Sequence, residues 1–199
     1  QKYGRVSEPG NYGALKIMCC KDCGYKMQNP RYQKEFYKEY YNFLYRKIAF
    51  GDIKPSKIYL AQQRKRGQLV LEWAKDNNVK TGYMLDHGCA SGATMIAWQK
   101  LGWKTFGIDP HRPSIKLAKQ IGLNAEIATG EKLPFVNNKF DLVLSLGSLE
   151  HAYDLKKTFL ELSRVIKKNG FLLIRWRSDK IFGSPLEYYN HNHYRFFTP

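Results

Sequence analysis

Two acidic residues, each at the end of an apolar run, are the residues of this sequence best placed to do chemistry. Asp86 follows the run 83–85, and Asp109 follows a second run at 104–108. Between them, the small-residue loop 88–92 precedes a helical pattern, so a strand, a tight turn and a helix N-terminus succeed one another. Glycine lets a ligand approach the backbone closely, and the free N–H groups of a helix N-terminus attract polar ligands. The pattern predicts a nucleotide-type pocket.

The charge of Asp86 narrows the choice of ligand. A carboxylate two residues before Gly88 repels a pyrophosphate and attracts a cation. It suits S-adenosylmethionine (SAM), which carries an ammonium and a sulfonium, and it suits NAD poorly. Asp109 lies 23 positions later, close to the spacing of about 20 at which a strand-end acid binds ribose hydroxyls. We interpret the two acids as an adenosine site; the alternative is a structural turn with solvated acids.

Further segments downstream carry a family resemblance. Residues 131–135 read Glu-Lys-Leu-Pro-Phe, residues 149–151 read Leu-Glu-His, and residues 164–170 read Arg-Val-Ile-Lys-Lys-Asn-Gly. With the glycine loop and the apolar run 140–146, they resemble, in order and spacing, the class I SAM-dependent methyltransferases over residues 81–177. The resemblance implies a Rossmann-like α/β sheet flanked by helices, SAM as cofactor, and methyl transfer as the reaction.

The resemblance also implies a cofactor site built from the loops that follow the strands. Its members are Asp86, Gly88, Cys89, Ala90, Gly92, Asp109, Pro110, Thr129, Gly130, Glu131, Leu133, Ser145, Leu146 and Leu149. Two of them depart from the family pattern. Ala90 replaces a glycine, which is tolerable if its φ is not positive. Thr129 stands where relatives often carry an acid near the adenine amino group, so its hydroxyl or the backbone of residues 130–131 would serve instead.

Histidines supply the candidate bases for an acceptor proton. His151 follows the fourth predicted strand, and its unperturbed pKa near 6.5 suits proton removal near neutral pH. The alternative is that His151 only orders its loop and caps a helix. The segment 183–195 is dense in hydrogen-bonding side chains and resembles methyltransferases of sugar and surface-polysaccharide pathways. In it, Tyr188, His191 and Arg195 are candidates for binding the acceptor, and His193 is a second candidate base.

The N-terminal region contains a possible metal motif. Cys20 and Cys23 form a C-x-x-C-G turn, which suits one half of a tetrahedral zinc site. The second half is absent from the sequence, because the remaining cysteines are the adjacent Cys19 and Cys89 of the glycine loop. We therefore weigh a zinc site at Cys20 and Cys23 against paired thiols that bind no metal.

Alternating periodicities give the expected elements. Two helices are expected over 33–47 and 56–77, followed by strands and helices in alternation, which predicts a mostly parallel sheet. Strands are expected near 83–86, 104–108, 125–128, 140–146 and 171–177, and helices near 92–101, 113–121 and 154–167. We expect an N-terminal cysteine-containing and aromatic helical segment at 1–50. A methyltransferase domain is expected at 51–199, incomplete because the family's last two strands are missing.

The amino-acid composition limits the kinds of molecule that this protein is expected to bind. The formal net charge is +16, and residues 1–80 carry +10 of it. This excess favours either solubility or an anionic small acceptor, ahead of nucleic acid. No apolar run is long enough to span a membrane, and the cysteine pattern suits a reducing cytoplasm. The sequence gives no indication of the oligomeric state.

Together these features predict a SAM-dependent methyltransferase that acts on a small polar acceptor, such as a sugar or nucleotide-sugar. One alternative is an RNA or protein methyltransferase that uses the basic N-terminal segment. A second alternative is a fragment that binds SAM without turnover.

Overall fold

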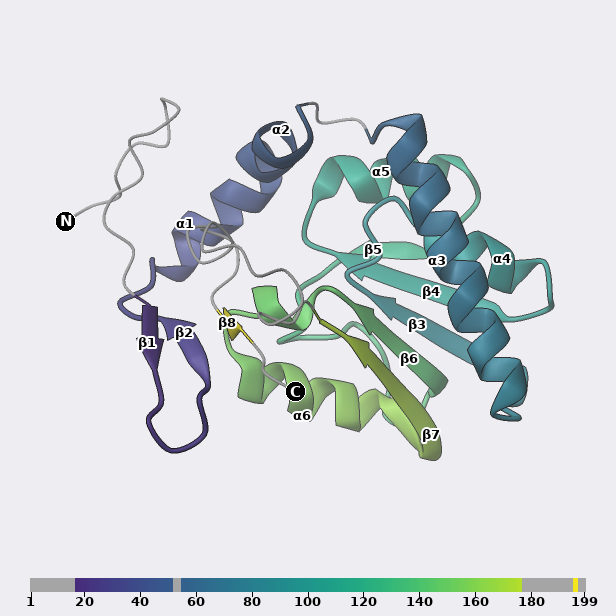
Figure 1. The fold of residues 1–199 in the computed structure, drawn as a ribbon. Helices are drawn as coiled ribbons and strands as arrows, with labels where there is room; N and C mark the ends of the chain where they lie inside the picture. Colours follow the sequence, from purple (N-terminus) through teal and green to yellow (C-terminus); the bar gives the residue numbers. More distant parts are fainter. Residues whose placement is uncertain (1–16, 52–54, 177–194, 197–199) are drawn as a thin grey trace.

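The core of the molecule is a five-stranded sheet in which each strand runs parallel to its neighbours (Figure 1). The computed structural model describes residues 17–51, 55–176 and 195–196 of the chain. The strand order is β5–β4–β3–β6–β7, so the winding direction reverses beside β3. The strands are β3 Tyr83–His87, β4 Lys104–Asp109, β5 Ala125–Ile127, β6 Phe140–Leu146 and β7 Ile166–Arg175. The predicted Rossmann-like α/β class is confirmed.

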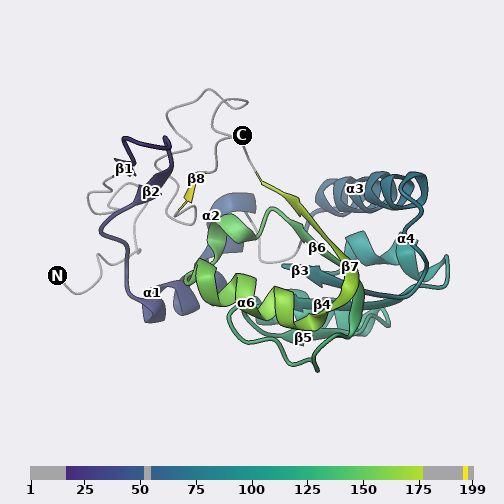
Figure 2. The same cartoon turned by 90° about the horizontal axis from the view of Figure 1, so that it is seen from below.

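Helices cover both faces of this sheet (Figures 1 and 2). On one face, α3, α4 and α5 bury Leu71, Trp98 and Ile115 in one apolar cluster. On the other face, α6 contributes Leu162 and Val165 to a second cluster. The helical elements are α3 Lys57–Asp76, η2 Ala93–Met95, α4 Ile96–Gln99, α5 Arg112–Gln120, η3 Leu149–His151 and α6 Leu155–Val165.

The side chains in the middle of β6 are buried on both faces of the sheet, so both faces must be covered by helices. Leu142, Val143 and Leu144 are consecutive, so their side chains alternate between the two faces, and all three are fully buried. Asp141, at the start of the strand, accepts a hydrogen bond from the backbone N–H of Tyr83 at 2.8 Å. Its other oxygen pairs with Lys167. This carboxylate ties the start of β6 to β3, while the opposite ends of the strands stay available for a site.

The N-terminal segment forms a second layer beside the sheet rather than part of it (Figure 1). The predicted helix 33–47 appears as α1 Lys34–Glu39, a π-helical turn η1 Tyr40–Leu44, and α2 Tyr45–Phe50. Its buried face is aromatic, with Phe36, Tyr37 and Tyr40 at its centre. A small antiparallel sheet β1–β2–β8 joins segments that are far apart in the sequence: β1 Ile17–Cys19, β2 Lys26–Gln28 and β8 Arg195–Phe196.

Two predicted boundaries are wrong by a few residues. The last helix was expected to run to 167, but α6 ends at Val165, because Ile166 turns to extended backbone and begins β7. The strand β7 therefore starts five residues before the expected 171, with an irregular register opposite Phe140 and Leu142. The motif at 164–170 therefore spans the last two residues of α6 and the first five of β7.

Candidate functional site

Asp86 and Asp109 lie at the carboxyl ends of two neighbouring strands, as the sequence predicted for them. In the β3–β4 register Asp86 is opposite Gly107, and Asp109 ends β4. Asp86 is buried. Burial, then the nearby Asp109 carboxylate, raises the pKa of Asp86 to about 7, and Arg66 opposes this shift. The two acids therefore form one electrostatic unit that favours a cation.

Asp109 also holds the glycine loop in place. Its Oδ2 accepts a hydrogen bond from the backbone N–H of Ala90 at 2.9 Å, and its Oδ1 accepts one from His111 at 2.8 Å. Burial raises the pKa of Asp109, while these two backbone hydrogen bonds oppose the rise. A carboxylate oxygen has room for two hydrogen bonds, so each oxygen of Asp109 retains capacity for a ribose hydroxyl.

The backbone of the glycine loop is left-handed at three positions. Gly88 has φ +84° and Gly92 has φ +76°. A methyl group on Gly88 would also lie only 2.5 Å from Ser148 Cβ, so both conformation and space require glycine. Ala90 has φ +50°, so the condition under which we considered an alanine tolerable here, a φ that is not positive, is not met. The structure places an L-residue where glycine would be unstrained.

A network of polar side chains packs against the glycine loop, residues 88–92. His87 Nδ1 lies 3.0 Å from both Ser145 Oγ and Ser148 Oγ, and the two hydroxyls are 2.8 Å apart. Ser148 also donates to the His87 carbonyl at 2.6 Å. Burial lowers the pKa of His87 to about 4, so this ring is neutral at pH 7. Ser145, one of the predicted cofactor residues, thus orders the junction between β3 and β6.

Gly130 packs against the second ring nitrogen of His87, Nε2. A methyl group on Gly130 would lie 2.3 Å from His87 Nε2, so no side chain fits there. The neighbouring Thr129 is exposed, and its carbonyl accepts a hydrogen bond from Lys132 at 3.2 Å. The predicted adenine role of Thr129 and Gly130 stays a prediction.

Several predicted cofactor residues direct their side chains into the core. Cys89 is buried in the cluster under α3 and α5, while Leu133 and Leu149 are buried in the cluster under α6. Pro110 and Leu146 are half-buried at the ends of β4 and β6. The core residues shape the pocket through their backbone and packing.

His151 receives a partner from the N-terminal segment. Tyr41 Oη lies 3.0 Å from His151 Nδ1, and the two rings meet edge to face. Tyr45 contacts the same imidazole. His151 also lies near enough to Asp109 to oppose the rise in the pKa of that carboxyl. Tyr41 therefore holds the ring of this candidate base through Nδ1.

Glu131 links three parts of the molecule. Its Oε1 accepts a hydrogen bond from the backbone N–H of Asp154 at 3.0 Å, and its Oε2 pairs with Lys34 of α1. Beside it, Arg31 donates to the Tyr153 carbonyl and covers the Tyr153 ring with its guanidinium 4.2 Å from the centroid. Predicted to bind cofactor, Glu131 is engaged in docking the N-terminal helix against the loops.

Two arginines at the site were missed in the sequence. Arg66, on α3, lies 3.4 Å from the Leu146 carbonyl and opposes the rise in the pKa of Asp86. Arg46, on α2, is buried, stacks on Tyr59, and opposes the rise in the pKa of Asp109. Both come from helices that precede β3, so only tertiary contacts reveal them. Arg66, which lies near enough to Asp86 to affect its pKa, has the charge to attract a carboxylate.

The cysteine turn forms the tip of the β1–β2 hairpin. The backbone N–H of Gly24 donates to the Cys20 carbonyl at 3.0 Å, and the thiols of Cys20 and Cys23 are exposed. Backbone hydrogen bonds from Cys23 and Asp22 lower the pKa of Cys20. In the described part of the chain, no cluster of three or more His, Cys, Asp or Glu side chains is arranged to hold a metal ion. The described thiols alone do not complete a zinc site.

Of the predicted acceptor-binding residues, only Arg195 lies within the described part of the chain. Tyr188, His191 and His193 lie outside the described residues. The backbone of Arg195 pairs with Met27 in the small sheet, on the N-terminal side of the molecule. Within the described ranges, no helix is long and apolar enough to cross a membrane.

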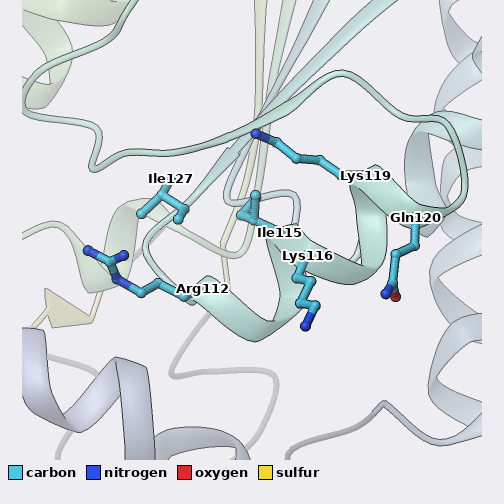
Figure 3. Close-up of a pocket in the computed structure, with 6 residues that line it drawn as sticks. All are labelled: Arg112, Ile115, Lys116, Lys119, Gln120 and Ile127. Carbon is cyan, nitrogen blue, oxygen red and sulfur yellow. The ribbon is translucent and has the colours of Figure 1, made fainter.

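A separate, basic pocket lies on the outer edge of the sheet (Figure 3). It has a volume of about 430 Å³, with Arg112, Lys116 and Lys119 of α5 around Ile115 and Ile127. Its lining residues do not include either strand-end acid. This pocket concentrates positive charge without belonging to the site at Asp86 and Asp109.

Comparison with known sequences agrees with this arrangement. Residues 85–174 match the family described as methyltransferase domain. The chain is 30% identical over 107 residues to the ubiquinone biosynthesis O-methyltransferase of Pelagibacter ubique, covering 51% of this chain and 44% of that protein. It is also 30% identical over 116 residues to the malonyl-acyl-carrier-protein O-methyltransferase of Hamiltonella defensa, covering 56% and 43%. The matches thus span less than half the length of these two relatives.

Solved structures show the same fold. The PH0226 protein of Pyrococcus horikoshii aligns with a TM-score of 0.57 at 22% identity, covering 78% of this chain and 72% of that one. The YcgJ protein of Bacillus subtilis aligns with a TM-score of 0.54 at 22% identity, covering 61% and 59%. Residues 85–174 are thus similar to the methyltransferase domain family, and the parallel sheet with its helices has the fold of these solved structures.

Proposed function

We propose that this chain binds SAM at the carboxyl ends of β3 and β4 and transfers its methyl group to a small polar acceptor. The observation that carries the proposal is the pair Asp86 and Asp109, two buried or half-buried acids joined by the glycine loop. Asp86 would bind the ammonium, Arg66 the carboxylate, and Asp109 the ribose hydroxyls. A dinucleotide would instead place its pyrophosphate against the Asp86 carboxylate, which is unfavourable.

In the proposed reaction the bound cofactor supplies an electrophilic methyl group on a sulfonium. The residues of this chain then have two tasks, which are alignment of the acceptor and removal of its proton. His151 is the candidate base for this proton, and Tyr41 holds its ring through Nδ1. The packed N-terminal helix, held by Lys34 and Arg31, covers the loops and excludes water.

Oxygen is the acceptor atom that we favour. Both curated relatives above are O-methyltransferases by name, and a histidine base is needed for a hydroxyl but not for a neutral amine. The net charge of +16 and the resemblance of the segment 183–195 support a sugar or nucleotide-sugar as acceptor. An RNA or protein acceptor is the second candidate, favoured by the +10 of residues 1–80.

Calorimetry tests the cofactor half of the proposal. The protein should bind SAM and should not bind NAD. Asp109→Asn should weaken SAM binding by about 1.5–3 kcal/mol, the scale of a charge-assisted hydrogen bond. Glu126→Gln, an exposed acid on β5, is the matched control and should bind SAM normally. Equal SAM affinity in Asp109→Asn would remove Asp109 from the site.

A methyl-transfer assay tests the acceptor half. Tritiated SAM is offered with nucleotide-sugars, phenols, bulk RNA and a protein mixture in separate reactions. Label in the sugar fraction supports the proposal, and label in RNA alone supports the second candidate. SAM binding without label in any fraction would favour a domain that binds SAM without turnover.

We also propose that Cys20 and Cys23 are half of a zinc site whose other ligands lie outside the described residues. The lowered pKa of Cys20 favours the thiolate that zinc requires. Metal analysis of the purified protein should then give close to one equivalent of zinc, lost in Cys23→Ser. Zinc retained in Cys23→Ser would refute this assignment.

A further inference from the structure

A buried carboxyl group on the β6 side of the sheet edge has no role in the proposed cofactor site. Glu150 lies in η3, directly after β6, and is only 4% exposed. Its Oε2 is buried and has no hydrogen-bond partner. A polar group buried in this way is costly unless something pairs with it, so an unpaired one in a binding region points to a ligand.

Arg175 approaches the same place from the end of β7. The backbone N–H of Gly147 donates to the Arg175 carbonyl at 2.7 Å, which brings the ends of β6 and β7 together. A methyl group on Gly147 would lie 3.6 Å from Glu150 Oε1 and 3.9 Å from Arg175 Nη1. The ion pairs found within the described ranges do not join these two side chains. A carboxylate and a guanidinium thus flank one point without neutralising each other directly.

The space between Glu150 and Arg175 lies on the side of the sheet edge where a methyl acceptor is expected. The cofactor acids end β3 and β4, whereas Gly147 and Arg175 follow β6 and end β7, on the other side of the strand-order reversal (Figure 1). An in-line displacement needs the acceptor opposite the sulfur, beyond the methyl group. The acceptor therefore belongs over the β6–β7 half of the edge.

We propose that Glu150 and Arg175 form an acceptor subsite for adjacent hydroxyl groups of a polyhydroxylated compound. One hydroxyl donates to Glu150, and the neighbouring oxygen accepts from Arg175. An anion at this point would be repelled by Glu150, and a cation would be repelled by Arg175. A neutral group with a donor beside an acceptor satisfies both. This inference rests on the proposed methyl transfer and specifies the substrate class and the residues that select it.

Thermal unfolding without any acceptor tests the unpaired carboxyl group. Glu150→Gln keeps the shape and removes the charge, so it should raise the Tm by about 2–4 °C. The matched control Glu126→Gln changes an exposed acid on β5 and should leave the Tm unchanged. An unchanged or lower Tm in Glu150→Gln would overturn the inference, because the carboxylate would then have a stabilising partner within the protein.

Saturation-transfer NMR tests the ligand class directly. The protein, saturated with S-adenosylhomocysteine, is offered glucose, galactose, mannose, rhamnose and UDP-glucose. We expect the parent to bind at least one of them, and Glu150→Gln and Arg175→Gln to bind it about 10- to 100-fold more weakly. Arg112→Gln on the outer face of α5 is the control for a lost arginine and should bind normally.

The outcomes separate this inference from the proposed function. A parent protein that does not bind the cofactor would contradict the proposed function itself. Cofactor binding with no sugar bound, or sugar binding that is equal in both variants and the parent, would overturn the subsite and leave the cofactor proposal standing.

Discussion

At the scale of single residues, Asp86 makes cofactor binding depend on pH. Its pKa in the folded protein is about 7, above the ordinary 3.8, because the side chain is buried beside Asp109. The folded state therefore favours protonated Asp86, and this contribution to stability is present below about pH 4 and is lost as the pH rises through 7. A bound ammonium favours the ionised form instead. SAM affinity should thus rise up to about tenfold per pH unit as the pH approaches 7 from below.

Calorimetry in buffers of different ionisation enthalpy measures this effect. At pH 6 the parent should release close to one proton as SAM binds, and Asp86→Asn should bind weakly at every pH with no release from this position. A parent protein whose SAM affinity is flat between pH 5.5 and 8 would refute the role of Asp86.

Ala90 gives a second prediction at this scale. Its φ of +50° is a conformation that costs an L-residue about 1 kcal/mol relative to glycine. Ala90→Gly should therefore raise the Tm by about 2–4 °C, measured by calorimetry. Ala93→Gly, at a buried turn with ordinary backbone, should lower it. If Ala90→Gly also destabilised the protein, the methyl group of Ala90 would have to contribute packing that outweighs the strain.

At the scale of elements, the sequence predicted those parts that are determined locally. Apolar runs ending in acids predicted β3 and β4, and their parallel pairing brings Asp86 and Asp109 together as expected. The π-helical turn η1 was not predicted, because hydrophobic periodicity does not distinguish it from an α-helix. Tyr41, Arg46 and Glu150 were missed as site residues. Their roles depend on contacts between distant positions, 110 apart for Tyr41 and His151 and 109 − 46 = 63 apart for Arg46 and Asp109, or on an absent partner, which a sequence pattern does not report.

The docking of the N-terminal helix depends on one acidic residue. Glu131 binds both Lys34 and the backbone of Asp154. Glu131→Ala should loosen α1 from the loops, so limited proteolysis within residues 17–51 should be several-fold faster. Glu126→Ala, an exposed acid on β5, is the control and should be cleaved at the rate of the parent. Equal cleavage of all three proteins would show that the aromatic contacts of Tyr37 and Tyr153 hold the helix without Glu131.

At the scale of the whole molecule, two described segments that are far apart in the sequence lie together. The β8 strand pairs with β2, so the cysteine hairpin and the segment after β7 share one small sheet. The division into residues 1–50 and 51–199 stays a prediction. The contacts of Lys34, Tyr41 and Arg31 with the loops nevertheless join the two predicted parts closely. A ligand at the strand ends would therefore contact elements from both.

The net charge of +16 allows the two acceptor classes to be separated by salt. Binding to RNA by scattered cations is electrostatic and weakens steeply with ionic strength, with a slope near −0.7 per phosphate neutralised on single strands. The pocket of Figure 3 gathers three of these cations, so the triple change Arg112→Gln, Lys116→Gln and Lys119→Gln should make that slope shallower by about 2. SAM affinity should not change, because the pocket lies apart from Asp86 and Asp109. Filter binding over 50–300 mM salt measures the slope, and methyl transfer to RNA is followed in the same samples. If the RNA were the true acceptor, methylation would survive at physiological salt; we expect residual RNA binding there without methylation.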